Sequence, residues 1–94
     1  MLRGRELADF LKSARTSAGL SQKEVAAALG YKSSQFVSNW ERGLSSPPIG
    51  TLRRLCRMYK TDESEVFRII RDIAIRKVEA DLEREFYSEE TPVS

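Results

Sequence analysis

One segment, residues 20–43, constrains the fold more than any other, because it has the pattern of two short helices joined by a turn. Ser21 and Glu24 form a capping-box pattern, in which the Ser21 hydroxyl accepts from the Glu24 amide and the Glu24 carboxylate reaches back to the Ser21 amide. This pattern predicts a helix over residues 22–29. Gly30 ends it, since glycine readily adopts the left-handed conformation found after a helix.

The second helix of this segment is expected over residues 34–42. Ser33 is its candidate N-cap, and Gly43 is a suitable left-handed residue after its C-terminus. Val37 and Trp40 are spaced to lie on one face, which fastens the helix to the body of the protein. Two short helices around a glycine-containing turn make a helix-turn-helix unit.

The opposite face of this second helix carries short hydrogen-bonding side chains, whereas an exposed face with no task more often carries Glu and Lys. Such amides and hydroxyls read base edges in the DNA major groove, and Asn and Gln suit bidentate contact with adenine. Gln22 and Lys23 begin the first helix, whose free amides and positive dipole end can hold a phosphate. The predicted base-reading residues are Ser34, Gln35, Ser38 and Asn39.

Helical periodicity also runs through the rest of the chain, and no segment alternates like a half-buried strand. Helices are expected over residues 5–17, 49–59 and 62–87, the last beginning at a second capping-box pattern made by Asp62 and Glu65. The predicted fold is therefore all-α with five helices. Its last helix extends well beyond the usual length of about 12 residues.

The length of 94 residues allows one domain with a modest core. We expect a helix-turn-helix domain over residues 1–70, a C-terminal helix extension over residues 71–87, and a disordered acidic tail over residues 88–94. The first part of the last helix supplies core side chains to the domain: Val66, Phe67, Ile69, Ile70 and Ile73.

Beyond residue 73 the last helix carries a second apolar stripe among charges of both signs. The helix can cover this stripe by folding back on its own domain, it can be a frayed amphipathic tail, or a second copy can cover the stripe in an isologous dimer. We favour the homodimer, because helix-turn-helix proteins gain affinity from two reading heads one DNA turn, ~34 Å, apart. The predicted dimer contacts are Ile75, Val78, Leu82 and Phe86.

Charge is divided unevenly along the chain. Residues 1–60 carry 11 Lys or Arg against 4 Asp or Glu, whereas residues 61–94 carry 5 against 10. The first part should therefore attract a polyanion and the second should repel it.

The chemistry of catalysis and metal binding is poorly represented. The chain has no histidine and a single cysteine, Cys56, on an apolar helix face, so His-based acid–base catalysis, the usual zinc sites and an internal disulfide are excluded. We expect no enzyme activity, no metal and no cofactor. No apolar stretch approaches the ~20 residues that cross a membrane, so we expect a cytoplasmic, nucleoid-associated protein.

Two strings, LSQKEVAAALG at residues 20–30 and VSNWERG at residues 37–43, resemble the Cro/C1-type (XRE) helix-turn-helix family of DNA-binding proteins. The resemblance covers residues 5–70 and implies a lambda-repressor-like domain. It implies that Gln22 binds phosphate and supports the reading helix. It also implies an ion pair between Arg15 and Glu41 that links the first and third helices.

The resemblance also assigns contacts to DNA. The principal base-reading positions fall on Ser34, Gln35 and Asn39, and a secondary one on Ser38. The loop after Gly43 and the start of the fourth helix commonly hold the phosphate backbone in this family. The predicted phosphate contacts are Gln22, Lys23, Lys32, Arg42, Ser45, Ser46 and Arg53.

The chain departs from the family pattern at residues 30–33, which hold one extra residue before the reading helix. Either the helix starts one residue earlier or the turn bulges. Phe36 stands where a small residue is common in the family. It either packs on Tyr31 or touches a thymine methyl group, and we favour packing because aromatic rings are more often buried.

These features predict a sequence-specific, double-stranded DNA-binding transcriptional regulator of bacterial or phage type, acting as a repressor and as a homodimer on a palindromic operator. The alternative is an antitoxin-like or adaptor protein whose C-terminal helix binds a protein partner, which the acidic second part would also suit. RNA binding fits less well, because A-form RNA hides its major groove.

Overall fold

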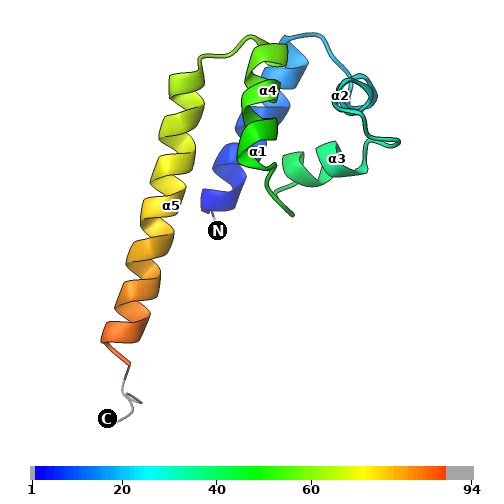
Figure 1. The fold of residues 1–94 in the computed structure, drawn as a ribbon. Helices are drawn as coiled ribbons and strands as arrows, with labels where there is room; N and C mark the ends of the chain where they lie inside the picture. The colour runs from blue at the N-terminus through cyan, green and yellow to red at the C-terminus, as the bar shows by residue number, and fades with distance from the viewer. Residues whose placement is uncertain (1, 89–94) are drawn as a thin grey trace.

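The computed structural model describes residues 2–88, with side chains from residue 5 onward. Within that range the chain forms five helices and no strand, which confirms the predicted all-α fold (Figure 1). The helices are α1 (Leu2–Ser17), α2 (Gln22–Leu29), α3 (Gln35–Glu41), α4 (Ile49–Tyr59) and α5 (Glu63–Phe86). Of the predicted tail over residues 88–94, all but the first residue lies outside the described residues.

Helix α1 lies at the centre of the arrangement and packs against α3, α4 and α5, while α2 packs against α3 (Figure 1). The core between these helices is closely filled, with Val25, Val37 and Leu55 almost completely buried. Trp40 and Leu11 join the same cluster. Val66 and Ile69 add the first half of α5 to this core, so residues 5–73 form one packed unit, which we call the head.

The helix ends around the first turn are those that the sequence predicts. The Ser21 hydroxyl accepts from the Glu24 amide at 3.0 Å, and the Glu24 carboxylate accepts from the Ser21 amide at 2.8 Å. Gly30 caps α2 in the left-handed conformation with φ at 90°, where a side chain would be strained. The predicted bounds of α2 and α4 are confirmed.

Two predicted helix starts need correction. Helix α1 begins at Leu2 rather than at residue 5. Helix α3 begins one residue later than predicted, so its N-cap is Ser34; the Ser33 hydroxyl still accepts from the Gln35 amide at 3.3 Å. The extra residue is thus absorbed in the turn, and the helix does not start earlier.

The start of α5 is capped differently from the predicted capping box. The Asp62 carboxylate accepts from the amide of Ser64 at 3.0 Å and from its hydroxyl at 2.8 Å. These two bonds satisfy the cap locally and hold the pKa of Asp62 below its ordinary value. The pairing of Asp62 with Glu65 is therefore wrong, although the N-cap position is right.

One predicted core residue of α5 is wrong. Val66 and Ile69 are buried, and Ile70 and Ile73 pack against the core as half-buried residues, but Phe67 is 58% exposed. Its side chain lines a groove between α4 and the first turns of α5, and the guanidinium of Arg71 lies 6.0 Å from the ring centroid. Helical spacing places Phe67 next to the core face of α5. The way α5 packs against the other helices leaves most of its side chain exposed, which helical spacing cannot predict.

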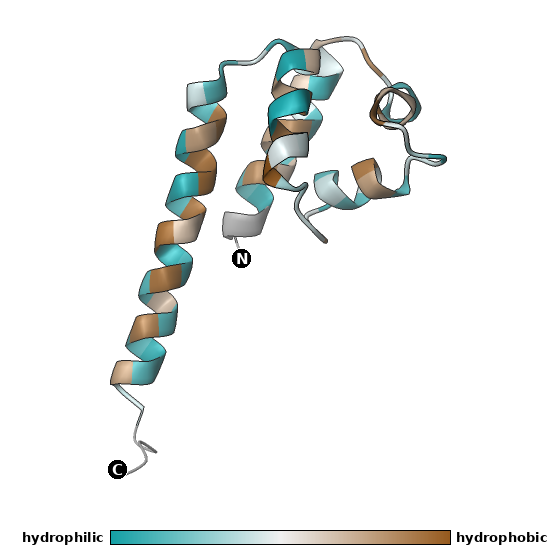
Figure 2. Ribbon diagram, in the orientation of Figure 1, coloured by the Kyte–Doolittle hydropathy of each residue, from teal (hydrophilic) through white to brown (hydrophobic). Residues whose placement is uncertain are grey.

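Helix α5 continues past the head as a single projecting rod (Figure 1). An ion pair between Arg76 and Glu6 at 3.3 Å joins the base of this rod to α1. The radius of gyration is 16.5 Å, against about 12 Å for a compact chain of this length. Hydrophobic residues nevertheless recur along the whole rod (Figure 2), so the projecting half has an apolar face that its own head does not cover.

Candidate nucleic-acid interface

Helix α3 presents its polar side chains outward because its apolar side chains are fixed in the core. Val37 is 1% exposed and Trp40 is 4% exposed. The Gln35 amide group donates to the Asn39 side-chain oxygen at 2.9 Å across one helical turn. This bond leaves the Gln35 oxygen as an acceptor and the Asn39 amide as a donor, side by side. Adenine offers the matching donor and acceptor in the major groove.

The two serines of the predicted reading face each precede one member of this amide pair by one residue. Ser34 and Ser38 are half-buried, as is Asn39, whereas Gln35 is exposed. The Ser38 hydroxyl accepts from the Arg42 guanidinium at 3.5 Å, at the limit of a hydrogen bond. The four residues predicted to read bases therefore lie together on α3 and at its N-cap, with polar atoms that remain open to a ligand.

A buried polar network holds α3 in place against α1 and α2. Arg15 donates to both carboxylate oxygens of Glu41, at 2.7 and 3.0 Å, and also to the backbone oxygen of Leu20 at 2.8 Å. Gln22 donates to the same carboxylate at 3.0 Å. The predicted ion pair between Arg15 and Glu41 is confirmed, and Gln22 supports the reading helix through its side chain.

The Arg15–Glu41 pair is shielded from water, because the two side chains are only 13% and 3% exposed. The hydrogen bond to Glu41 raises the pKa of Arg15 above its ordinary value, against the opposing effect of burial. Tyr59 packs nearby, and burial raises the pKa of its phenol to about 12. Removing one partner of a buried pair leaves the other charge uncompensated, which costs about 3–5 kcal/mol.

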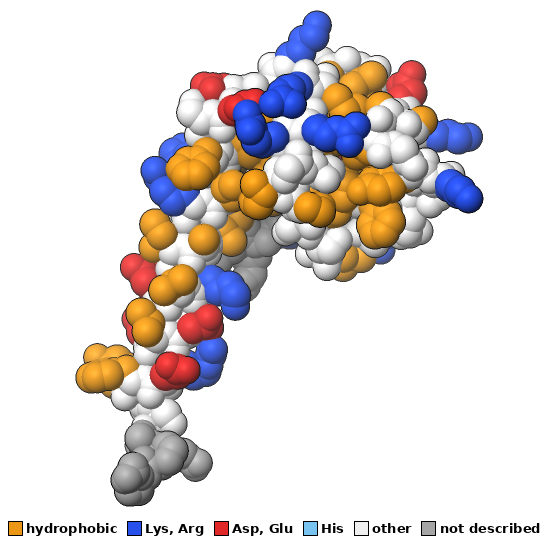
Figure 3. Space-filling view, in the orientation of Figure 1, with side chains coloured by type: hydrophobic (Ala, Val, Ile, Leu, Met, Phe, Trp, Pro, Cys, Tyr) orange, Lys and Arg blue, Asp and Glu red, His pale blue; other side chains and the backbone are white. Residues whose placement is uncertain are grey.

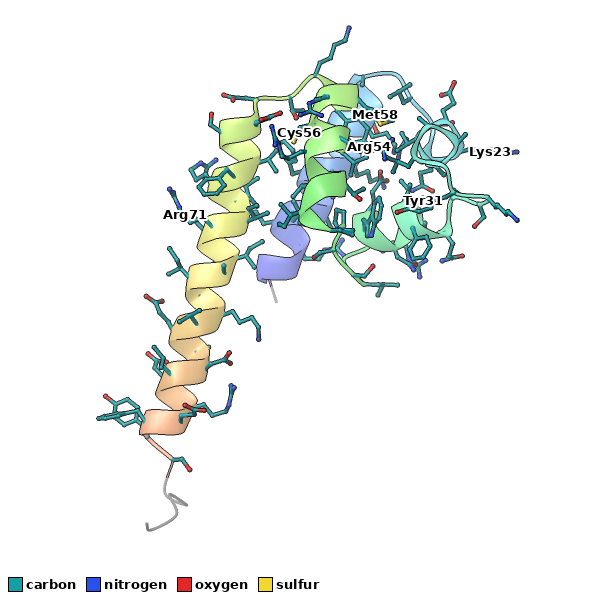
Figure 4. The ribbon with its side chains drawn as sticks, in the orientation of Figure 1. Lys23, Tyr31, Arg54, Cys56, Met58 and Arg71 are labelled. Carbon is teal, nitrogen blue, oxygen red and sulfur yellow. The ribbon has the colours of Figure 1, made fainter. Side chains whose placement is uncertain are left out.

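Most of the predicted phosphate contacts lie exposed near α2, near α3 and in the loop after α3. Lys23, on the first turn of α2, points away from the body of the molecule (Figure 4). Gln22 is half-buried, since its amide faces Glu41. The other exposed members of this set are Lys32, Arg42, Ser45 and Ser46.

Arg53 is not brought together with these residues. It lies on the α5 side of α4, where its guanidinium is 3.7 Å from the carboxylate of Glu63. There it lines a groove of about 420 Å³ between α4 and the first turns of α5. Cys56 is also in that lining, buried, with the pKa of its thiol raised by burial.

One basic residue beside the reading helix was not predicted. Arg5 donates to the backbone oxygen of Arg42 at 3.3 Å, which places an exposed guanidinium of α1 at the C-terminal end of α3. The two residues are 37 positions apart, so no local pattern could have linked them. The packing of α1 on α3 supplies this link, and it adds Arg5 to the candidate phosphate contacts.

An aromatic cluster borders the turn between α2 and α3. The Phe36 and Tyr31 rings are 5.0 Å apart, and Trp40 lies 6.1 Å from Tyr31. Phe36 thus packs on Tyr31, as favoured from the sequence. It also remains 54% exposed, so one side of its ring is open beside the reading face.

The projecting half of α5 forms the other exposed surface. Space-filling shows hydrophobic side chains following one another along the rod (Figure 3). The predicted dimer residues are all exposed, so the alternative in which the helix folds back over its own head is wrong. We call the exposed stripe that runs along α5 from the head through the projecting half the outer face of α5; its large apolar members are Phe67, Ile75, Val78, Leu82 and Phe86, exposed by 48–78%.

Comparison with known proteins identifies the class. Residues 6–68 match the family described as a helix-turn-helix domain, so the chain belongs to that family. The match spans the head and agrees with the resemblance to XRE-type proteins. No curated protein and no solved structure matches the chain.

Helix-turn-helix domains are DNA-binding units that place their second helix in the major groove. In this chain that second helix is α3, and α2 precedes it. Between residues 2 and 88, none of the helices has the length and hydrophobicity needed to cross a membrane.

Proposed function

We propose that this protein is a transcriptional regulator that reads a specific double-stranded DNA sequence through α3. The amide pair of Gln35 and Asn39 is the observation that carries the proposal. Its two side chains are already bonded to each other at 2.9 Å, on a helix fixed by Val37, Trp40 and the buried Glu41 network. A reading helix that is ordered before it meets DNA loses less conformational entropy on binding.

The proposed division of labour follows the chemistry of the exposed groups. Ser34, Gln35, Ser38 and Asn39 contact base edges. Around them, the basic and hydroxyl side chains and the N-terminus of α2 hold the phosphate backbone, which fixes position without reading sequence. The proposed phosphate contacts are Arg5, Gln22, Lys23, Lys32, Arg42, Ser45 and Ser46, with Arg53 as an outlying member.

The protein acts as a homodimer on a palindromic operator. One head of this size makes few base contacts, and two-fold pairing of heads doubles them on a site with inverted half-sites. The exposed outer face of α5 supports this, since an apolar helix face needs a partner surface. We propose a repressor, because occupying a promoter requires nothing beyond tight binding, and a cytoplasmic protein associated with the nucleoid.

In vitro selection from random double-stranded DNA at near-physiological salt tests the proposal. We expect enrichment of one motif that contains adenine and is repeated in inverted orientation. Enrichment of a single half-site would support sequence-specific binding and contradict the proposed dimer on a palindromic operator. Binding to every fragment alike, with affinity that depends only on salt, would contradict sequence reading altogether.

A second candidate is an antitoxin-like or adaptor protein, in which α5 binds a different protein. The specific observation in its favour is that the outer face is exposed along a helix whose end is acidic. Purification of the tagged full chain distinguishes the two: a stable stoichiometric complex with a basic protein favours the adaptor, and a clean homodimer favours the regulator.

A further inference from the structure

The charge of the chain changes sign at Val78 within α5. The ten residues before it, 68–77, contain four basic side chains and one acidic one, whereas the ten residues after it, 79–88, contain one basic side chain and four acidic ones. The two ten-residue segments therefore have net charges of +3 and −3. A parallel pair of such helices sets like charge beside like charge along these segments, and an antiparallel pair sets each segment beside its opposite.

Two charged residues, Arg71 and Glu85, lie within the outer face itself and favour an antiparallel over a parallel pair. Arg71, Val78 and Glu85 are spaced by seven residues, so they follow one line along the helix. Arg71 points away from the rest of the molecule (Figure 4), and Glu85 is exposed on the described end of the rod. In a parallel pair each of these charges would meet its own copy at the centre of the apolar contact.

We propose that a second copy of this chain packs against the outer face of α5 in antiparallel orientation, with the two-fold axis at Val78. This inference rests on the proposed dimeric regulator and specifies how its two heads are joined. Around the axis, Arg71 faces the partner's Glu85, and Ala74, the smallest side chain of the outer face, faces the partner's Leu82. Val78 then faces the partner's Val78, so the two outer faces cover each other around the axis.

This arrangement sets the heads at opposite ends of the helix pair. Ile69 and Val66, the last buried residues of α5, lie 9 and 12 residues before Val78. At about 1.5 Å per residue, the two attachment points are about 27–36 Å apart along the pair. The distance between successive major grooves on one side of DNA is ~34 Å, so the separation has the scale that two half-sites need.

Charge reversal tests the orientation in the full chain. Arg71→Glu places a carboxylate opposite the partner's Glu85 at both ends of the pair, so we expect the dimer dissociation constant to rise about tenfold. Glu85→Arg should have a similar effect, and the double variant Arg71→Glu/Glu85→Arg should return to within about threefold of the parent. Sedimentation equilibrium without DNA measures all four proteins.

Arg84→Glu is the matched control. It makes the same charge reversal on the same helix. However, Arg84 does not belong to the line of residues spaced by seven, and it pairs with Asp81 at 2.7 Å within its own helix. This variant should not weaken the dimer. Loss of dimer in Arg84→Glu as large as in Arg71→Glu, or no rescue in the double variant, overturns the antiparallel pairing.

Disulfide formation gives an independent measurement. Ala74→Cys and Leu82→Cys chains, mixed and oxidised, should form a crossed 74–82 dimer, while Leu82→Cys alone should not link to itself; buried Cys56 does not compete. A Leu82→Cys homodimer would show a parallel pair and overturn the proposal. A chain that is monomeric at tens of micromolar also overturns it. The DNA selection on the head reports separately on the proposed function.

Discussion

The head and the projecting half of α5 differ in the burial of their apolar side chains. In the head, Val25, Val37 and Leu55 are less than 2% exposed, and the one buried carboxylate among the described residues, that of Glu41, has three donors around it. In the projecting half, Val78 and Leu82 are more than half exposed. The head is therefore complete as a single copy, whereas the projecting half is a surface without its partner.

This difference separates the properties that each region should control. Substitutions in the head core should change the free energy of unfolding, and substitutions on its reading face should change DNA recognition. Substitutions on the outer face of α5 should change association between copies while the fold of one copy stays intact. The following experiments test that separation, either with a pair of matched residues or with a pair of DNA substrates.

The largest expected effect comes from truncating a core side chain of the head. Trp40→Ala should lower the free energy of unfolding by about 3–5 kcal/mol, since it removes a buried ring that joins α3 to the core. Leu82→Ala, at dilute concentrations where the chain is monomeric, should change it by no more than about 0.5 kcal/mol. Urea denaturation followed by circular dichroism measures both. A large loss in Leu82→Ala would mean that the rod contributes to the fold of one copy.

The sequence predicts those parts of the fold that short-range chemistry decides. The bounds of α2 follow from Ser21, Glu24 and Gly30, all within nine residues of one another, and the structure contains those caps. The existence and face of α3 follow from Val37 and Trp40 in the same way. The class of protein was also predictable, since the two helices and their turn lie in one segment.

The rest depends on packing between distant residues. The one-residue shift at the start of α3 arises in the turn, where Ser33 and Ser34 offer equivalent hydroxyls and no local rule chooses between them. Phe67 is wrong as a core residue because only the direction in which α5 leaves the head decides its exposure. The contact of Arg5 with Arg42 likewise requires the packing of α1 on α3.

The next effect in size is a dependence of stability on alkaline pH, located in the head. The pKa of Tyr59 is about 12 in the folded protein, against about 10 in an unfolded chain. Below pH 10 both states hold the proton, so the stabilisation is complete. Between pH 10 and pH 12 the unfolded state loses its proton first, and the free energy of unfolding should fall by about 2 kcal/mol.

Tyr59→Phe removes this titration, and Tyr87→Phe is the matched control at the end of α5, where Tyr87 is 75% exposed. Lysines also titrate in this range, so the informative quantity is the difference between each variant and the parent. The fall in the urea midpoint between pH 9 and pH 11.5 should be smaller than in the parent for Tyr59→Phe only. An equal flattening in Tyr87→Phe would contradict the assignment to the buried ring.

Discrimination between DNA sequences should respond to the reading face of the head. Asn39→Ala should weaken binding to the selected site by about 1–3 kcal/mol and leave binding to random DNA nearly unchanged, because it removes half of the amide pair. Fluorescence anisotropy on both DNAs at one salt concentration measures the ratio. Equal losses on the two DNAs would show that Asn39 does not read bases.

The smallest expected effect compares two arginines of the head in the salt dependence of DNA binding. Each phosphate contact adds about 0.9 to the slope of log affinity against log salt. Arg42 is exposed at the end of α3 beside Arg5, so Arg42→Ala should reduce the slope by about that amount per copy. Arg53 is on the α5 side of α4, next to Glu63, and Arg53→Ala should reduce it less. An equal reduction in Arg53→Ala would mean that DNA extends along α4 towards the helix pair, and the boundary between the reading and associating regions would then move into α4.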